Sequence, residues 1–274
     1  MRVLLFVSLA LLSACSTAPK KAPEIRSQRE GAEKQLELAN RQVERGDFEG
    51  ALALLDFARQ LAISADDPGL RVRTALSLGN IYFYQGRMEE ADAEWAAALA
   101  EAQASGNREL AAAARIYGAR GRLLRAAAEG NGAAAAAAVK NDVNRAMEGI
   151  KNDKLSLALG WTVIGLAEKE SRRFGEAESA VKKAVAIYQK ENYLEQAGYG
   201  WYLIASIRSV AGNYAEAEAA LGEAIALDRR AENSWGLAMD WRALADVRRK
   251  AGKTALAEEA AARSAEIQQV LGER

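Results

Sequence analysis

The sequence predicts an all-α solenoid of about six antiparallel helix pairs, and three observations lead to that fold class. Alanine supplies much of the 50% hydrophobic share, and the chain has only 3 prolines among 274 residues. Alanine loses no side-chain entropy on entering a helix, so this composition favours helices. Trp161, Trp201 and Trp241 recur every forty residues, which is typical of a repeat architecture. Glycines recur where a pair needs a tight turn, at Gly46, Gly86, Gly212 and Gly252.

Composition also restricts the function classes. Lys+Arg and Asp+Glu both number 37, so the balanced charge gives no case for nucleic acid, whose binding needs clustered cations. The chain has no histidine, which removes the usual catalytic triads and most zinc sites. Phosphate-binding glycine loops and nucleophile elbows are missing from the sequence, and the acidic runs Glu89-Glu90 and Glu258-Glu259 fit solvated helix faces. We therefore expect a non-enzymatic protein without a cofactor or metal ion.

The first residues read as an export signal. Arg2 precedes a run at 3–12 that is apolar except for Ser8, which is too short to span a bilayer but suits a secretory signal. The run ends in "LSAC", which resembles a bacterial lipobox and implies a signal peptide over 1–14 and lipidation of Cys15. Several acyl chains at one cysteine would anchor the protein stably. The alternative is an ordinary secretory signal with a chance cysteine.

The segment after the cysteine predicts a tether and a location. Residues 15–31 hold two of the 3 prolines together with Lys, Ser and Gln, a composition typical of a linker. By the sorting rule of enteric-type lipoproteins, Ser16 after the cysteine implies the outer membrane. We therefore expect a lipid-anchored body that faces the periplasm.

Residues 32–274 carry the repeat in two halves. The first half of a unit follows the frame of Trp161-x-x-Ile164-Gly165. Three residues after the tryptophan position comes an apolar residue, and a small residue follows it directly. The second half places a small residue at equivalent positions, Ala51, Ala91, Ala177 and Ala217. The chain thereby resembles the tetratricopeptide repeat (TPR), which implies a right-handed superhelical solenoid with units near 32–65, 72–105, 108–151, 158–191, 198–231 and 238–271.

The units depart from the common form in length. The period is forty residues rather than about 34, and the closing proline is absent, as in the variety with longer helices. The third unit is degenerate, with a long first helix near 108–128 and six alanines at 133–138 opening its second. Polar residues suited to N-caps start the units, with Pro68 at a first helical position: Asp67, Asn107, Asp153, Asn192 and Asn233.

The resemblance implies a concave groove lined by the first helix of each pair. Asn40 and Asn80 occupy equivalent places there, and an amide can pair with a peptide backbone. The lysines of a carboxylate clamp are replaced by Leu36 and Leu76, with Arg120 a candidate substitute for one cation. The candidate partner-binding residues are Asn40, Asn80, Phe83, Tyr84, Arg120, Lys169, Tyr199, Tyr202, Ser206, Arg242, Asp246 and Arg249. The alternatives are solvated asparagines, tyrosines that pack between repeats and a solvated basic helix end.

Two functions follow from this reading. The first is a membrane-anchored scaffold or adaptor that recruits or stabilises an envelope protein through its groove, and by layout it resembles pilus pilotins and outer-membrane assembly lipoproteins. The second is a lipoprotein that encloses a small ligand and serves a solute transport system. An open groove would favour the first, and a closed pocket would favour the second.

Overall fold

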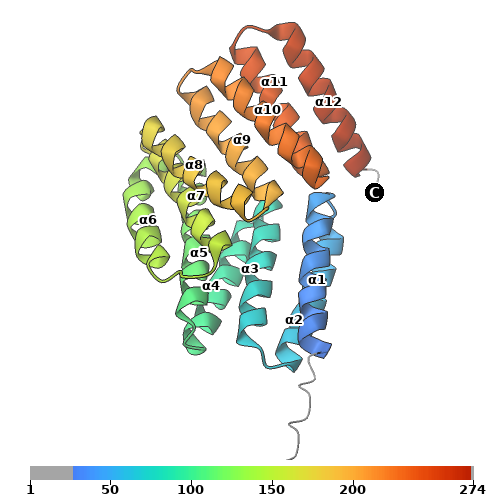
Figure 1. The fold of residues 1–274 in the computed structure, drawn as a ribbon, viewed down its shortest axis with the longest axis vertical. Coiled ribbons are helices and arrows are strands. Elements are labelled where there is room, and N and C mark those ends of the chain that lie inside the picture. The colour runs from blue at the N-terminus through green and yellow to red at the C-terminus, as the bar shows by residue number, and fades with distance from the viewer. Residues whose placement is uncertain (1–26, 273–274) are drawn as a thin grey trace, which may run out of the picture.

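The computed structural model describes residues 27–272, which form twelve α-helices in six consecutive pairs (Figure 1). The predicted all-α solenoid of antiparallel helix pairs is therefore confirmed. The described residues contain no strand. The helices are α1 (Ser27–Glu44), α2 (Phe48–Ser64), α3 (Pro68–Tyr84), α4 (Met88–Ala104), α5 (Arg108–Ala128), α6 (Gly132–Met147), α7 (Lys154–Glu170), α8 (Phe174–Lys190), α9 (Leu194–Val210), α10 (Tyr214–Ala231), α11 (Ser234–Lys250) and α12 (Thr254–Gly272).

Small residues at the helix crossings explain how each pair packs. The equivalent alanines Ala51, Ala91, Ala177 and Ala217 are all completely buried. Gly79 and Gly165 provide the same close approach from the first helix of the pair, against Trp95 and Val181 respectively. No pair can bury its apolar face alone, so successive pairs stack into one array.

Gly165 gives a direct test of this packing. A methyl group there would meet the Val181 side chain and lie 3.0 Å from the Ala177 carbonyl oxygen, which is backbone and cannot swing away. We expect Gly165→Ala to lower the free energy of unfolding by about 1–3 kcal/mol through overpacking. Urea titration followed by circular dichroism measures this. Gly222→Ala is the control, because open space surrounds Gly222 and the better helix former should stabilise by about 0.5–1 kcal/mol. Equal responses would contradict the packing account.

The turns and caps follow the sequence with one exception. The turn glycines Gly46, Gly86, Gly212 and Gly252 have positive φ angles between 75° and 87°. Asp67 caps α3, accepting a hydrogen bond from the Leu70 amide at 3.0 Å. The expected cap at Asn192 is wrong, because Asn192 adopts a left-handed turn conformation with φ 61° and Tyr193 takes the cap position.

Ion pairs fix how neighbouring units stack. Arg208 on α9 pairs with Glu178 on α8 at 2.7 Å, and Arg248 on α11 pairs with Glu218 on α10 at the same distance. The two pairs are equivalent positions forty residues apart. The hydrogen bond from Arg208 lowers the pKa of Glu178 to about 2, with Lys182 assisting. Repeated charge pairs therefore add to the apolar packing at the α8–α9 and α10–α11 interfaces.

The array curves until its two ends meet. The first helices of successive pairs contact one another along the inside of the curve, as α1 with α3, α3 with α5, α5 with α7 and α9 with α11. Helix α1 also contacts α11, so the first pair lies beside the last (Figure 1). The two ends of the array thus narrow the concave face into a partly open cavity. Among residues 27–272, no helix combines the length and apolar character that a bilayer crossing requires.

Candidate functional site

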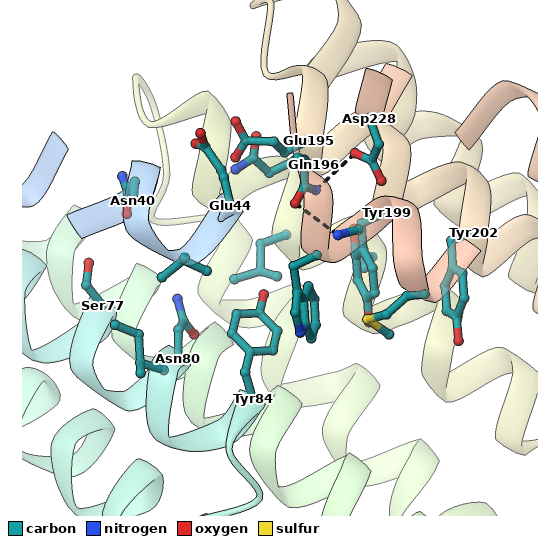
Figure 2. Close-up of a pocket in the computed structure, with 18 of the residues that line it drawn as sticks. Asn40, Glu44, Ser77, Asn80, Tyr84, Glu195, Gln196, Tyr199, Tyr202 and Asp228 are labelled. Atoms are coloured by element: carbon teal, nitrogen blue, oxygen red, sulfur yellow. Dashed lines mark hydrogen bonds between the residues drawn. The ribbon is translucent and has the colours of Figure 1, made fainter. Parts of the chain in front are cut away.

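The ends of the array enclose a cavity of about 270 Å³ on the concave face. All six first helices contribute side chains to it: α1, α3, α5, α7, α9 and α11. Figure 2 shows Asn40 and Asn80 on one side of this cavity and Tyr199 and Tyr202 on the other. Ligand sites are typically concave spaces of about 300–1,000 Å³ lined by aromatic and a few polar groups, so this cavity is slightly smaller than the usual range.

The seam that closes the cavity is aromatic. The Trp235 ring on α11 lies 6.0 Å from the Phe48 ring, edge to face, and 5.2 Å from the Tyr84 ring. Gly46, in the first turn of the array, lies against Leu271 near its end. Aromatic pairs of this kind contribute about 0.5–1.5 kcal/mol each, so the seam is weak compared with the interfaces inside the array.

Removing Trp235 should loosen the seam and little else. We expect Trp235→Ala to increase hydrogen exchange of the α1 and α11 amides, because both ring contacts to the first units are lost. The amides of α7 and α8 should be unaffected. Phe57→Ala is the matched control, since Phe57 is a 49% exposed aromatic residue outside the cavity. Unchanged exchange in α1 and α11 would show that the ends do not depend on Trp235.

Arg120 is a buried cation without a carboxylate. Only 6% of this residue is exposed, and its one hydrogen bond goes from Nη2 to Asn80 Oδ1 at 2.6 Å. Its Nε is buried without a hydrogen-bond partner. Rings of Phe83, Trp95 and Tyr117 surround the guanidinium at 5.1–5.6 Å. Cation–π contacts repay part of the desolvation cost, but a buried charge is ordinarily paired.

Carboxyl groups collect at the opposite side of the cavity. The Glu195 carboxyl on α9 lies near the Glu44 carboxyl on α1, so this approach crosses the seam between the two ends of the array (Figure 2). Burial, together with the hydrogen bond and charge of Glu44, raises the pKa of Glu195 to about 8. The Glu195 carboxyl therefore keeps its proton near neutral pH, because burial and a nearby like charge both disfavour its ionised form.

A second carboxyl pair lies beside the first. Asp228 and Asp240 are only 3% and 2% exposed and hydrogen-bond to each other. Burial is the main cause that raises both pKa values, and the charge of Asp228 adds to the rise in the pKa of Asp240. Asn233 donates to Asp228 at 3.1 Å, which favours Asp228 as the ionised member. Asp240 Oδ2 is buried without a partner.

Tyrosine rings form the wall between these charged groups. Tyr84 is 39% exposed and Tyr199 is 37% exposed, yet both line the cavity, so much of their free surface faces the enclosed space. Tyr199 stacks on Tyr202 with 6.0 Å between centroids and 14° between planes. Burial raises the pKa of Tyr199, so the phenol stays neutral. The wall is thus apolar with neutral hydroxyl groups.

The structure brings together half of the candidate residues. Six line the cavity: Asn40, Asn80, Tyr84, Arg120, Tyr199 and Tyr202. The other six do not: Phe83, Lys169, Ser206, Arg242, Asp246 and Arg249. Phe83 packs on Trp95 and under Arg120 instead, and Asp246 pairs with Arg249 on an exposed face at 2.6 Å. Cys15 and the signal segment lie outside the described residues.

Sequence reasoning missed the acidic side of the cavity and the seam tryptophan. The missed residues are Glu44, Glu195, Gln196, Asp228, Trp235 and Asp240. A helical stripe could have found some of them, because Trp235 and Met239 continue the face of Arg242 and Asp246 toward the start of α11. Within residues 27–272, no group of three or more Asp, Glu, Cys or His side chains is placed to hold a metal ion.

Comparisons with known proteins agree on the fold. No family model and no curated protein matches the chain. A Rap protein, solved in complex with Competence and Sporulation Factor, superposes with a TM-score of 0.59 at 13% identity, covering 89% of this chain and 76% of that one. The chain has a TPR-like fold. A TPR protein from Thermus thermophilus has a TM-score of 0.52 at 17% identity, covering 75% of this TPR-like chain and 98% of that one.

Proposed function

We propose that this TPR-like chain is a lipid-anchored, non-enzymatic binding protein of a bacterial envelope that holds a segment of a partner protein in its concave cavity. The observation that carries the proposal is the enclosed cavity with Tyr84 and Tyr199 presenting free aromatic surface inside it. Aromatic surface of this kind typically anchors a partner. The superposition with the Rap protein supports the same role, because that protein was solved with a bound factor. A cavity of about 270 Å³ suits a short or terminal segment.

Photo-crosslinking in the envelope tests this function. A photoreactive phenylalanine analogue at Tyr199 should give a crosslinked partner protein that mass spectrometry identifies. The same analogue at Phe57, which is exposed and outside the cavity, should not give that product. No protein adduct at Tyr199, or the same adducts at both positions, would overturn the proposal.

Anchoring is a separate part of the proposal and rests on the "LSAC" motif at 12–15. We expect Cys15→Ser to abolish labelling of the protein by an alkyne analogue of palmitate, because the thiol that carries the diacylglycerol is gone. The variant should also leave the outer-membrane fraction if sorting follows Ser16. Labelling that survives the substitution would rule out lipidation at Cys15.

The closed seam favours the second function as well, in which the cavity holds a small ligand for a transport system. Contacts from Trp235 to Phe48 and Tyr84 join the two ends of the array beside the cavity, which makes it narrower than an open groove. Native mass spectrometry of the full chain purified from cells distinguishes the two functions. A bound species of small-molecule mass that departs on unfolding would support this alternative, and its absence together with a Tyr199 crosslink would reject it.

A further inference from the structure

The one cation that lines the cavity among the described residues lies apart from the carboxyl groups, and this separation indicates what kind of ligand the cavity holds. We propose that the cavity binds a short zwitterion of the amino-acid or oligopeptide type, with its carboxylate at Arg120 and its amine among the carboxyl groups across the cavity. This inference rests on the second function given above, in which the cavity holds a small ligand, and it takes the same cavity as the binding site. It goes further by assigning the ligand's two charged ends to opposite walls.

The anionic end is assigned by what Arg120 lacks. Among the described residues that line the cavity, Arg120 is the one Lys or Arg, and no Asp or Glu pairs with it. Its Nε remains a buried donor without an acceptor, beside Asn80, which already accepts from Nη2. A guanidinium presents its donors as a planar fork that matches a carboxylate. A ligand carboxylate would supply the missing acceptor and the missing negative charge together.

The cationic end is assigned by the carboxyl groups and by a second buried orphan atom. Glu44 and Glu195 meet across the seam, and Asp228 and Asp240 lie beside them. Asp240 is 2% exposed, and its Oδ2 has no hydrogen-bond partner. An ammonium group has three donors and no acceptor, so it can satisfy acceptors that the carboxyl groups cannot satisfy among themselves. Figure 2 shows Glu44, Glu195 and Asp228 grouped apart from Asn80 and Tyr84.

The size and the wall of the cavity limit the ligand between these ends. A volume of about 270 Å³ equals roughly nine water molecules, so it accepts on the order of ten heavy atoms. That is a free amino acid or a dipeptide of small residues. The tyrosine wall, with Tyr84 and Tyr199 facing the space, offers apolar surface to the body of such a ligand. An internal segment of a folded protein has neither free end and would leave both charged sites unsatisfied.

Binding of defined zwitterions to the full chain tests the inference. Native mass spectrometry would be run with the twenty free amino acids, with unmodified di- and tripeptide mixtures, and with the same peptides N-acetylated or C-amidated. We expect unmodified ligands to bind, and each blocked end to weaken binding by about ten- to a hundredfold, because a charge-assisted hydrogen bond is lost. Binding by amino acids alone identifies a free metabolite-sized source, and binding by peptides alone identifies a peptide source.

Matched variants assign the two ends. Arg120→Met should abolish the preference for a free carboxyl end. Glu44→Gln with Glu195→Gln should reduce the preference for a free amine, because Asp228 and Asp240 remain in the cavity. Arg249→Met and Asp246→Asn are controls of the same chemistry on an exposed face, and they should bind as the wild type does. If Arg120→Met does not fold, Arg120→Lys keeps the charge without the fork and should bind more weakly.

Two results would overturn the inference. One is equal binding of free and blocked peptides, and the other is the absence of binding by any zwitterion. If the Tyr199 analogue still crosslinks a partner protein in that case, the proposed function stands and the zwitterion assignment alone fails. If no crosslink forms either, both fail.

Discussion

Replacing Trp95 with alanine is expected to lower the free energy of unfolding by about 3–5 kcal/mol, the largest effect of any single substitution considered for this chain. Trp95 is 2% exposed and is wedged between two first helices, with Gly79 of α3 on one side and Gly121 of α5 on the other. A methyl group at either glycine would collide with the indole. Removing the ring therefore leaves a void both within its own helix pair, against α3, and toward the next pair, against α5.

Urea titration followed by circular dichroism measures the loss. Trp161→Ala is a matched control, because Trp161 is only partly buried and its ring lies under Lys183 at 4.2 Å, so its removal should cost less. Trp95→Phe should cost less as well, since it keeps most of the ring and removes an indole N–H that is buried without a partner. A loss below about 1 kcal/mol for Trp95→Ala would contradict a wedge role.

The sequence was sufficient to predict the pairs because their determinants are local. The turn glycines, the small residues at helix crossings and the polar caps each act within one or two units, and the forty-residue period repeats them. Asn192 was the exception because an asparagine suits both a cap and a left-handed turn, and here the turn conformation at φ 61° won. Local patterns of this kind predict that a helix is present more reliably than they predict the residue at which it begins.

The closure of the array depends on angles that accumulate over six pairs, so no local pattern encodes it. The inward face of α9 and α11 carries Tyr199 and Trp235 in their first halves, whereas α1 and α3 contribute Asn40 and Asn80 from their second halves. The candidate residues Asp246 and Arg249 lie at the other end of α11 and stay outside. A repeat sequence indicates which face of a helix turns inward. The rise of the superhelix determines which positions along that face lie opposite the other wall of the cavity.

Asn80 shows how a single polar residue acquires its meaning only in three dimensions. Its place one unit after Asn40 predicts a groove position, and it lines the cavity. The repeat also places Arg120 at the equivalent position one unit later, but it could not predict that Arg120 donates to Asn80 at 2.6 Å. The asparagine therefore orients a buried guanidinium instead of facing open solvent.

The second large effect concerns pH. We expect the free energy of unfolding to fall as the pH rises from about 5 to about 9, because the cavity carboxyl groups bind protons that the unfolded chain has released. The pKa of Glu195 is raised to about 8, and those of Asp228 and Asp240 are raised by burial. A carboxyl group with a raised pKa makes its full contribution to stability at pH values below its pKa in the unfolded chain. That contribution is lost as the pH rises through its pKa in the folded protein. The paired Glu178, whose pKa is lowered to about 2, acts in the opposite direction and only at acidic pH.

Asp240→Asn separates this contribution from the rest of the chain. The amide keeps a donor for Asp228 but has no proton to lose, so the variant should show a shallower pH dependence and exceed the wild type near pH 9 by on the order of 1–3 kcal/mol. Near pH 5 the two proteins should be similarly stable, because Asp240 is then protonated and equally neutral. Asp246→Asn, in an exposed ion pair with Arg249, should leave the slope unchanged. Chemical denaturation at several pH values checks both, and a wild-type stability that is flat or rising over this interval would mean that the cavity carboxyl groups are ionised in the folded protein.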